Sequence, residues 1–321
     1  MKIFVDMALP ADALEALKAG AVGHELLFPR TPATSVLAKG DTDPLFFTAD
    51  IVFGQPDPAA VDRSTLLKWI HVSSSGITRY DNAGFRSLVT GRGIAVSNSA
   101  AVFADACAVH VFSFIVAQAR NLPAALRTRT PNGTAAWNEL RRGSSTLAGE
   151  SVLILGYGSI GKRLAELLKP LGMEVVGFRR RLRGDEPIPM VTENGLAEAM
   201  GRAQHIVNIL PDNAGSRGFF DAERFESLSN GAVFYNIGRG VTVDQTALLG
   251  ALRSGRLKAA WLDVTDPEPL PDDHPLWQQP NCFITPHTAG GQGAEFDVLV
   301  RHFIDNLKRF VAGQPLADRV M

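Results

Sequence analysis

The sequence is poor in cysteine and has no long uncharged apolar run. Only Cys107 and Cys282 occur among 321 residues, both in apolar surroundings, so a disulfide framework is not expected. No apolar run of about 18 residues is free of charge, which argues against a membrane span. The formal net charge is only −1, so general attraction to nucleic acid or to anionic lipid is not expected either.

Targeting signals are also lacking at the beginning of the sequence. The first 20 residues contain neither a basic segment leading into an apolar core nor a small-residue cleavage site. Together with the scarcity of cysteine, this predicts a cytoplasmic, reducing location. The composition, with 45% apolar and 20% charged residues, is that of an ordinary globular protein, and the length of 321 residues favours two domains over one core.

Short apolar runs alternate with helical patterns along most of the chain, which favours an α/β fold. In the first part, strands are expected at residues 2–7, 50–54, 67–74 and 94–99. Residues 101–123 then predict one long helix, apolar around most of its circumference, which we expect to be buried in a core or at a subunit interface. The polar, turn-rich stretch 127–150 is expected to be a surface excursion.

In the second part the alternation is tighter and predicts a doubly wound parallel sheet. Its strands are expected at residues 151–156, 174–178, 205–210, 232–237, 259–264 and 282–286. Helical stretches separate most of these strands, and residues 293–313 have the pattern of a last amphipathic helix.

A glycine pattern, G-x-G-x-x-G, follows the first of these strands. Gly156 permits a tight turn, Gly158 lets the backbone approach a pyrophosphate, and Gly161 lets the helix pack on the sheet. The free N–H groups at the start of that helix, around Ser159 and Ile160, would bind the phosphates of a dinucleotide. The alternative is a tight turn without a ligand, but the apolar strand before it and the amphipathic helix after it favour a nucleotide site.

A run of arginines follows the next strand, in the stretch "GFRRRLRG". A carboxylate at this place, roughly 20 residues beyond the glycine motif, would hold the ribose of NAD. Arg179 and Arg180 stand there instead, and Asp185 and Glu186 are expected to lie well out in the following loop. A guanidinium binds a 2′-phosphate with a charge-assisted fork, so the run favours NADP(H) over NAD(H). The alternative is a solvated charge run.

Three further motifs occur in the second part of the chain. They are "NIGRG", "LDVTDPEPLPDDHPLW" and "ITPHTAGG", at residues 236–240, 262–277 and 284–291. With the glycine motif upstream and in this order, they resemble the D-isomer-specific 2-hydroxyacid dehydrogenases. That resemblance implies a Rossmann-type doubly wound sheet inserted into a second, flavodoxin-like α/β domain. It places a substrate-binding lid domain at residues 1–98 plus 289–321 and a dinucleotide-binding domain at residues 99–288.

The resemblance also implies a catalytic set of Arg239, Glu268 and His287. Reduction of a 2-oxo acid needs a hydride donor, a proton donor and an anchor for the carboxylate. A histidine can hold a transferable proton near neutral pH, a bonded glutamate favours its protonated form, and an arginine fork suits a carboxylate. Each residue has a plainer alternative, as a surface ion-pair residue, a solvated turn residue and a cap. Their joint placement at the expected carboxyl edge of one sheet favours the site.

Other positions follow from the same resemblance. Asp263 matches the residue that contacts the nicotinamide carboxamide, and Pro211 and Ser216 match the cofactor-side loop. No metal is expected. The remaining histidines at 71, 110 and 205 are expected to be structural, and His274 to lie in a surface loop.

A substrate loop is implied by the stretch "HVSSSGITRYD". Ser74, Ser75 and Gly76 match the segment whose backbone N–H groups bind the substrate carboxylate. The two hydroxyl groups are expected either to contact a polar substrate or to cap the following helix. Arg79 is expected to lie exposed at a helix start, or else to meet a second acidic group of the substrate.

The resemblance therefore implies NADP(H)-preferring reduction of a small 2-oxo acid to the D-2-hydroxy acid. Glyoxylate or hydroxypyruvate is the first expectation for the substrate, and a homodimer formed through the nucleotide domain is expected. Two alternatives stay open. One is a dinucleotide-sensing protein like the corepressor relatives on the same fold, and the other is a formate dehydrogenase, whose pattern lacks the glutamate found here as Glu268.

Overall fold

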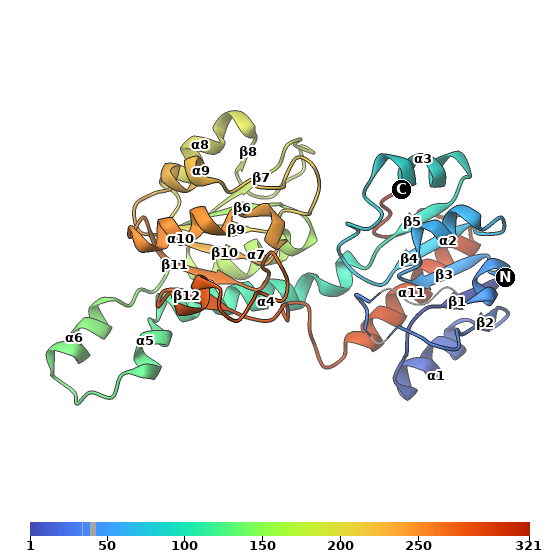
Figure 1. Cartoon of the computed structure of the whole chain (residues 1–321), viewed down its shortest axis with the longest axis horizontal. Helices are drawn as coiled ribbons and strands as arrows, with labels where there is room; N and C mark the ends of the chain where they lie inside the picture. The colour runs from blue at the N-terminus through green and yellow to red at the C-terminus, as the bar shows by residue number, and fades with distance from the viewer. Residues whose placement is uncertain (34, 39–42) are drawn as a thin grey trace. The chain divides into compact units, whose positions relative to one another are not determined.

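The chain forms two compact units, each built around one parallel β-sheet with flanking helices. The computed structural model describes residues 1–33, 35–38 and 43–321. Unit 1 comprises Met1–Phe103 and Gly291–Met321, and unit 2 comprises Ala104–Gly290 (Figure 1). The predicted α/β fold is confirmed by these two sheets. The division of labour between a lid domain and a dinucleotide domain, with its predicted boundaries, stays a prediction.

The sheet of unit 1 has the strand order β2-β1-β3-β4-β5. Its strands are β1 (Lys2–Val5), β2 (Glu25–Leu27), β3 (Ile51–Gly54), β4 (Trp69–Val72) and β5 (Ala95–Ser97). The helices are α1 (Ala11–Gly20), η1 (Pro44–Thr48), α2 (Pro58–Arg63), α3 (Ala83–Gly91) and α11 (Glu295–Val311). The amphipathic α11 packs on the sheet through the fully buried Phe303, whose ring stacks on Phe53 at 4.2 Å and on Trp69 at 5.3 Å.

The sheet of unit 2 is doubly wound, as predicted, with the order β12-β11-β10-β9-β6-β7-β8. Its strands are β6 (Ser151–Leu155), β7 (Glu174–Phe178), β8 (Met190–Val191), β9 (His205–Asn208), β10 (Ala232–Asn236), β11 (Leu257–Leu262) and β12 (Cys282–Ile284). Because β6 pairs with both β7 and β9, the strand order reverses there. Ligands of such sheets bind at the carboxyl ends of the strands beside this reversal.

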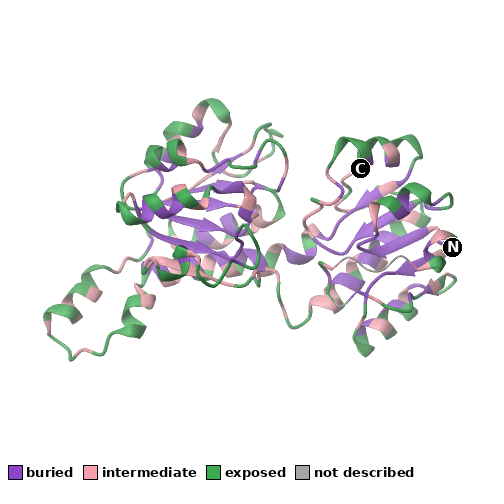
Figure 2. Cartoon of the chain, viewed as in Figure 1, coloured by how far each residue is buried: buried purple, intermediate pink, exposed green. Residues whose placement is uncertain are grey.

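Helices of unit 2 flank the sheet and expose their outer faces, whereas the central strands are mostly buried and β8 and β12 are half-buried (Figure 2). They are α7 (Ser159–Leu168), η2 (Lys169–Leu171), α8 (Glu193–Arg202), α9 (Ala222–Ser227), η3 (Gly240–Thr242), α10 (Gln245–Arg253) and η4 (Pro275–Gln278). The expected surface excursion contains two short helices, α5 (Leu122–Arg127) and α6 (Ala135–Arg142), which extend away from the sheet (Figure 1).

The predicted long helix is α4 (Ala100–Ala119). By length and composition alone it would also qualify as a membrane-crossing helix, a test that core helices of globular proteins pass as well. Its side chains have protein partners instead: Asp105 pairs with Arg163 of α7 at 2.6 Å, and Phe114 packs on Trp261 of β11. Burial is only partial, because Val109 is 44% exposed on the outer face.

Candidate active site

In unit 2, each of the three glycines of the motif is required for a different geometric reason. Gly156 has a φ of +98°, and a Cβ there would lie 2.7 Å from the carbonyl oxygen of Ile209. A Cβ on Gly161 would lie 2.9 Å from the carbonyl oxygen of Gly156, so this glycine lets α7 approach the sheet. A Cβ on Gly158 would meet nothing within 4 Å. Gly158 therefore faces open space next to Ser159, at the start of α7. Without a side chain at Gly158, the phosphates of a ligand can approach the backbone there.

A cavity of about 390 Å³ lies at the carboxyl ends of β6, β7 and β9. It brings together four segments, at residues 156–158, 178–180, 193 and 209–219, and with them six of the predicted cofactor residues. These six are Gly156, Gly158, Arg179, Arg180, Pro211 and Ser216. A glycine-rich turn, a helix start and a guanidinium in one cavity fit a dinucleotide, because they offer N–H groups and positive charge to its phosphates.

Arg179 already has a carboxylate partner. Its Nη1 lies 3.0 Å from Oε1 of Glu186, and that carboxylate also accepts the backbone N–H groups of Arg183 and Gly184 at 2.8 and 2.9 Å. These contacts hold the pKa of Glu186 at about 2, with the Arg183 N–H as the main cause. The expectation that Glu186 lies well out in the loop is therefore wrong, since its carboxylate folds back and closes the loop on Arg179.

Arg180 lies differently, although it is the next residue. Its Nη1 is so close to Gly215 that a Cβ on that glycine would lie 2.6 Å away. Gly215 thus leaves room for the guanidinium over the loop that follows β9. Within the described part of the chain, no carboxylate lies within 4.0 Å of the Arg180 guanidinium, which lines the cavity together with the acidic Glu193.

Ser216 has its hydroxyl turned into its own loop. The hydroxyl donates to the carbonyl oxygen of Pro211 and accepts the N–H of Asn213 at 3.1 Å, and the residue is only 4% exposed. It shapes the cofactor-side wall of the cavity through the turn that it closes.

The predicted proton donor is paired as expected. Nδ1 of His287 lies 2.5 Å from Oε1 of Glu268, which leaves Nε2 free of this contact. His287 has a φ of +52°, a left-handed backbone conformation that residues other than glycine seldom adopt. Such conformations cost about 1–3 kcal/mol and persist only where neighbouring contacts hold them.

Asp263 supplies those contacts. Its carboxylate accepts the hydroxyl of Thr285 at 2.6 Å and the backbone N–H groups of Thr288 and Ala289 at 2.8 and 2.9 Å. Its carbonyl oxygen accepts the N–H of His287 at 2.9 Å. Asp263 is almost wholly buried, and its bonds attach the loop both before and after His287. The sequence did not indicate this role, because only the expected nicotinamide contact had been assigned to Asp263.

Arg239 lies half-buried in the loop after β10. Its Nη1 donates to the carbonyl oxygen of Gly238 at 2.6 Å. Burial lowers the pKa of Arg239, and the carboxylates of Glu268 and Asp212 oppose this shift. A Cβ on Gly240 would lie 1.9 Å from the carbonyl oxygen of Thr265. Gly240 therefore lets the arginine loop lie against the segment that leads to Glu268, which explains the Arg-Gly pair physically.

Two residues of α4 lie beside this group. Nε2 of His110 is 3.3 Å from Oγ1 of Thr285 and 3.6 Å from Oδ1 of Asp263. Burial lowers the pKa of His110, opposed by Asp263. Burial also raises the pKa of the Cys107 thiol to about 12, with Asp263 adding to the shift. His110 is packed, as expected, but its packing against Asp263 places it next to the candidate site. In the sequence, only the helical spacing of residues 107, 110 and 114 indicates that these side chains lie on one face of α4.

The expected substrate loop lies in unit 1, after β4. The Ser74 hydroxyl donates to the carbonyl oxygen of Gly76 at 2.7 Å and accepts Nε2 of Gln55 at 2.8 Å. Capping of the following helix is wrong for this hydroxyl, because α3 begins only at Ala83 and Asn82 caps it, whereas contact with a polar substrate stays a prediction. The next helix, α3, begins only at Ala83, so Arg79 lies not at a helix start but in a turn, half-buried. Its Nη1 is 3.4 Å from the carbonyl oxygen of Gln55.

Comparison with known proteins is decisive for the family. A family model described as "D-isomer specific 2-hydroxyacid dehydrogenase, NAD binding domain" matches residues 112–289, more than half of the chain. The chain belongs to this family. It is therefore a dehydrogenase that uses a nicotinamide dinucleotide, and the residues of the cavity fit that group.

Relatives and solved structures agree. The chain is 32% identical to a human glyoxylate reductase/hydroxypyruvate reductase over 71% of this chain and 70% of the human one. A mouse protein of the same name is 37% identical over 61% of this chain and 60% of its own length. The crystal structure of an NADPH-dependent glyoxylate/hydroxypyruvate reductase from Sinorhizobium meliloti, in complex with NADP and sulfate, has a TM-score of 0.77 at 25% identity, covering 99% of this chain and 98% of that one.

Removal of the Asp263 carboxylate tests its hold on the histidine loop. Asp263→Ala leaves two backbone N–H groups and one hydroxyl without their acceptor, so we expect the free energy of unfolding to fall by about 3 kcal/mol. Asp266→Ala is the matched control, because Asp266 is exposed and its side chain has no bond among the described contacts; a change within about 0.5 kcal/mol is expected. Urea unfolding of both variants measures the difference. Equal losses would show that Asp263 does not anchor the loop.

Proposed function

We propose that the protein reduces a small 2-oxo acid, such as glyoxylate or hydroxypyruvate, to the D-2-hydroxy acid with NADPH as its preferred cofactor. The observation that carries the proposal is the pairing of His287 with Glu268 in the same unit as a cavity lined by the glycine turn and by the Arg180 guanidinium, which has no carboxylate within 4.0 Å among the described residues. The human and mouse relatives named for glyoxylate and hydroxypyruvate reduction support the substrate class. The bound NADP of the Sinorhizobium meliloti structure supports the cofactor.

The chemistry follows from the residues present. When bound, the nicotinamide supplies the hydride. His287 holds a proton on Nε2 and donates it to the carbonyl oxygen, because Glu268 holds the ring through Nδ1. In the opposite direction the same nitrogen accepts the proton. Arg239 binds the substrate carboxylate and polarises the neighbouring carbonyl oxygen through its free guanidinium nitrogens.

The remaining roles belong to the same proposal. Asp263 contacts the nicotinamide carboxamide, besides anchoring the histidine loop. In unit 1, the backbone N–H groups of the loop Ser74–Gly76 bind the substrate carboxylate. Arg179 and Arg180 recognise the 2′-phosphate. Arg180 gives the sharper test, since the Arg179 guanidinium already shares its charge with Glu186.

We also infer a homodimer and a cytoplasmic location. The outer face of α4 exposes Val109, and the excursion beyond it exposes Leu122 and Leu126, which is 83% exposed. A second copy of the chain that covers these side chains would bury apolar surface. The two cysteines are unpaired, which suits a reducing compartment.

Substitution of the histidine tests the proposed reaction. For His287→Gln we expect kcat with glyoxylate or hydroxypyruvate to fall by about 10²- to 10⁴-fold, because the proton donor is lost, while the Kd for NADPH stays unchanged. His274→Gln is the control, since His274 only caps η4. NADPH absorbance gives the rates and NADPH fluorescence the binding. A wild-type protein that binds the dinucleotide but reduces no 2-oxo acid would favour a sensing role, and oxidation of formate would identify a formate dehydrogenase.

A second substitution tests the cofactor preference. Arg180→Gln removes the charge that faces the cavity, so we expect KM for NADPH to rise about 10- to 100-fold while KM for NADH changes little. Arg181→Gln is the control, because Arg181 is exposed and does not line the cavity. Initial rates with both cofactors measure the effect. Equal rises with NADPH and NADH, or a wild-type preference for NADH, would refute 2′-phosphate recognition by Arg180.

A further inference from the structure

The substrate loop of unit 1 is held at two carbonyl groups. Nδ2 of Asn98 donates to the carbonyl oxygen of Ser75 at 2.6 Å, and the N–H of Ser99 donates to the carbonyl oxygen of Ser74 at 3.1 Å. A trans peptide is planar, with its C=O and N–H pointing in opposite directions. A fixed Ser74 carbonyl therefore fixes the N–H of Ser75, and a fixed Ser75 carbonyl fixes the N–H of Gly76. These are two of the three N–H groups proposed to bind the substrate carboxylate.

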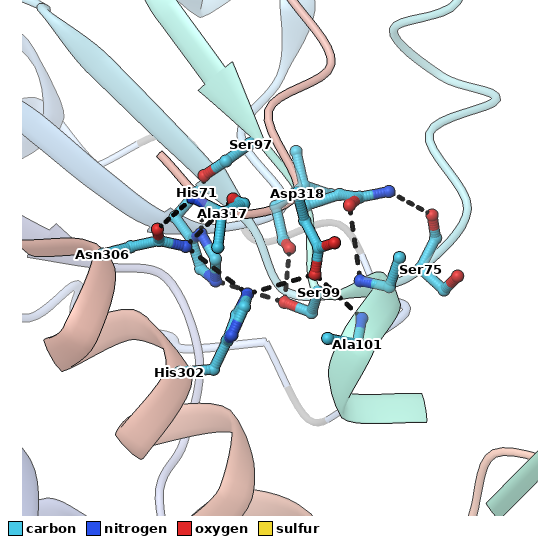
Figure 3. Close-up of polar contacts among 12 residues, drawn as sticks. His71, Ser75, Ser97, Ser99, Ala101, His302, Asn306, Ala317 and Asp318 are labelled. Carbon is cyan, nitrogen blue, oxygen red and sulfur yellow. Dashed lines mark hydrogen bonds and ion pairs between the residues drawn. The ribbon is translucent and has the colours of Figure 1, made fainter. Parts of the chain in front are cut away.

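Asn98 is held in turn by Asp318, near the other end of the described chain, and Figure 3 shows Asp318 with its partners His302 and Ala101. The N–H of Asn98 donates to the carbonyl oxygen of Asp318 at 3.0 Å. The carboxylate of Asp318 accepts the N–H of Ala101 at 2.8 Å, in the first turn of α4. Asp318 therefore binds the backbone at Asn98 and at Ala101, the two ends of the turn from which the Asn98 side chain reaches Ser75.

The Asp318 carboxylate is itself fixed and charged. Its Oδ2 lies 3.3 Å from Nε2 of His302 on α11, and its side chain is 19% exposed. Burial by itself would raise the pKa of Asp318, but the bonds from His302 and Ala101 outweigh it and lower the pKa. The neighbouring His71 is fully buried, which lowers its pKa to about 3, so the ring beside this pair is neutral.

The segment around Asp318 does not need this carboxylate for its own attachment. Asn306 of α11 bonds both backbone groups of Ala317, at 2.8 and 3.2 Å, and Val320 pairs with Val96 of β5. Asp318 has a φ of +51°, a conformation that favours glycine. An aspartate tolerates this conformation better than most residues, and its carboxylate adds the bonds to the Ala101 N–H and to His302 that no apolar side chain could make.

We propose that Asp318 is a positioning residue for substrate binding. By holding the turn at residues 98–101 it sets the direction of the Gly76 N–H through Asn98 and of the Ser75 N–H through Ser99, without touching the substrate itself. The inference rests on the proposed function in one respect, namely that this loop binds the carboxylate of a 2-oxo acid. Asp318, in the segment Ala317–Met321, therefore affects the affinity for the substrate and does not affect the affinity for the dinucleotide.

Kinetics separate this role from a purely structural one. For Asp318→Ala we expect KM for glyoxylate or hydroxypyruvate to rise about 3- to 10-fold, with KM for NADPH unchanged. Asp318→Asn keeps an oxygen acceptor and a residue that tolerates the left-handed backbone, so it restores most of the affinity. Arg319→Ala is the matched control, because its side chain is exposed and bonds only the carbonyl oxygen of Met321. A rise in both KM values, or no rise in either, would overturn the proposal.

Hydrogen exchange gives a readout that does not depend on turnover. In Asp318→Ala, the amides of residues 74–79 should exchange faster than in the wild type and in Arg319→Ala, while those of β6 and α7 stay unchanged. Unchanged exchange at residues 74–79 would refute the positioning role, whatever the enzyme proves to do. Faster exchange together with an unchanged KM would show that the loop is held by Asp318 but does not bind the substrate. A wild-type protein without 2-oxo acid reduction would refute only the proposed function.

Discussion

The carboxylate of Asp263 is the interaction on which the candidate active site depends most. It accepts three hydrogen bonds from the loop that carries His287, and its own carbonyl oxygen accepts the N–H of that histidine. The histidine backbone stays in a left-handed conformation under this constraint. Glu268 then needs to control only the ring. The orientation of the His287 backbone is thus settled by buried, charge-assisted bonds, which are stronger than bonds between neutral groups.

Carboxylates also fix the backbone at the nucleotide cavity and in unit 1. There, too, they act by holding a loop or a turn in place. The Glu186 carboxylate closes the loop after β7 on Arg179, which leaves the neighbouring Arg180 as the cation that faces the cavity. Asp318 holds the turn from which Asn98 reaches the substrate loop. In each of these places a carboxylate outside the proposed contacts orients the group that makes them. A description limited to the contacting residues would omit the parts that fix their geometry.

The sequence predicted the two parallel sheets, because these depend on local pattern, and it named the candidate site residues from short motifs. The strands β6, β7 and β9 to β12 are apolar runs, and the reasons for Gly156, Gly158 and Gly161 follow from the turn itself. The strands β2 and β8 were not predicted; they have three and two residues, and no longer apolar run marks them. Other features depend on contacts between segments: the bond of Glu186 to Arg179, the bonds of the Ser74 hydroxyl, and the bonds of Asp318 to the turn at Asn98. No local pattern announces such contacts.

Isotope transfer tests the central claim most directly, because it follows the hydride itself. The protein is incubated with hydroxypyruvate or glyoxylate and NADPH that carries deuterium at the 4-pro-R position, and the product is examined by NMR and chiral chromatography. The account predicts deuterium on C2 of the hydroxy acid and, from hydroxypyruvate, the D isomer alone. A product without deuterium, an L product, or no reduction of any 2-oxo acid would contradict it.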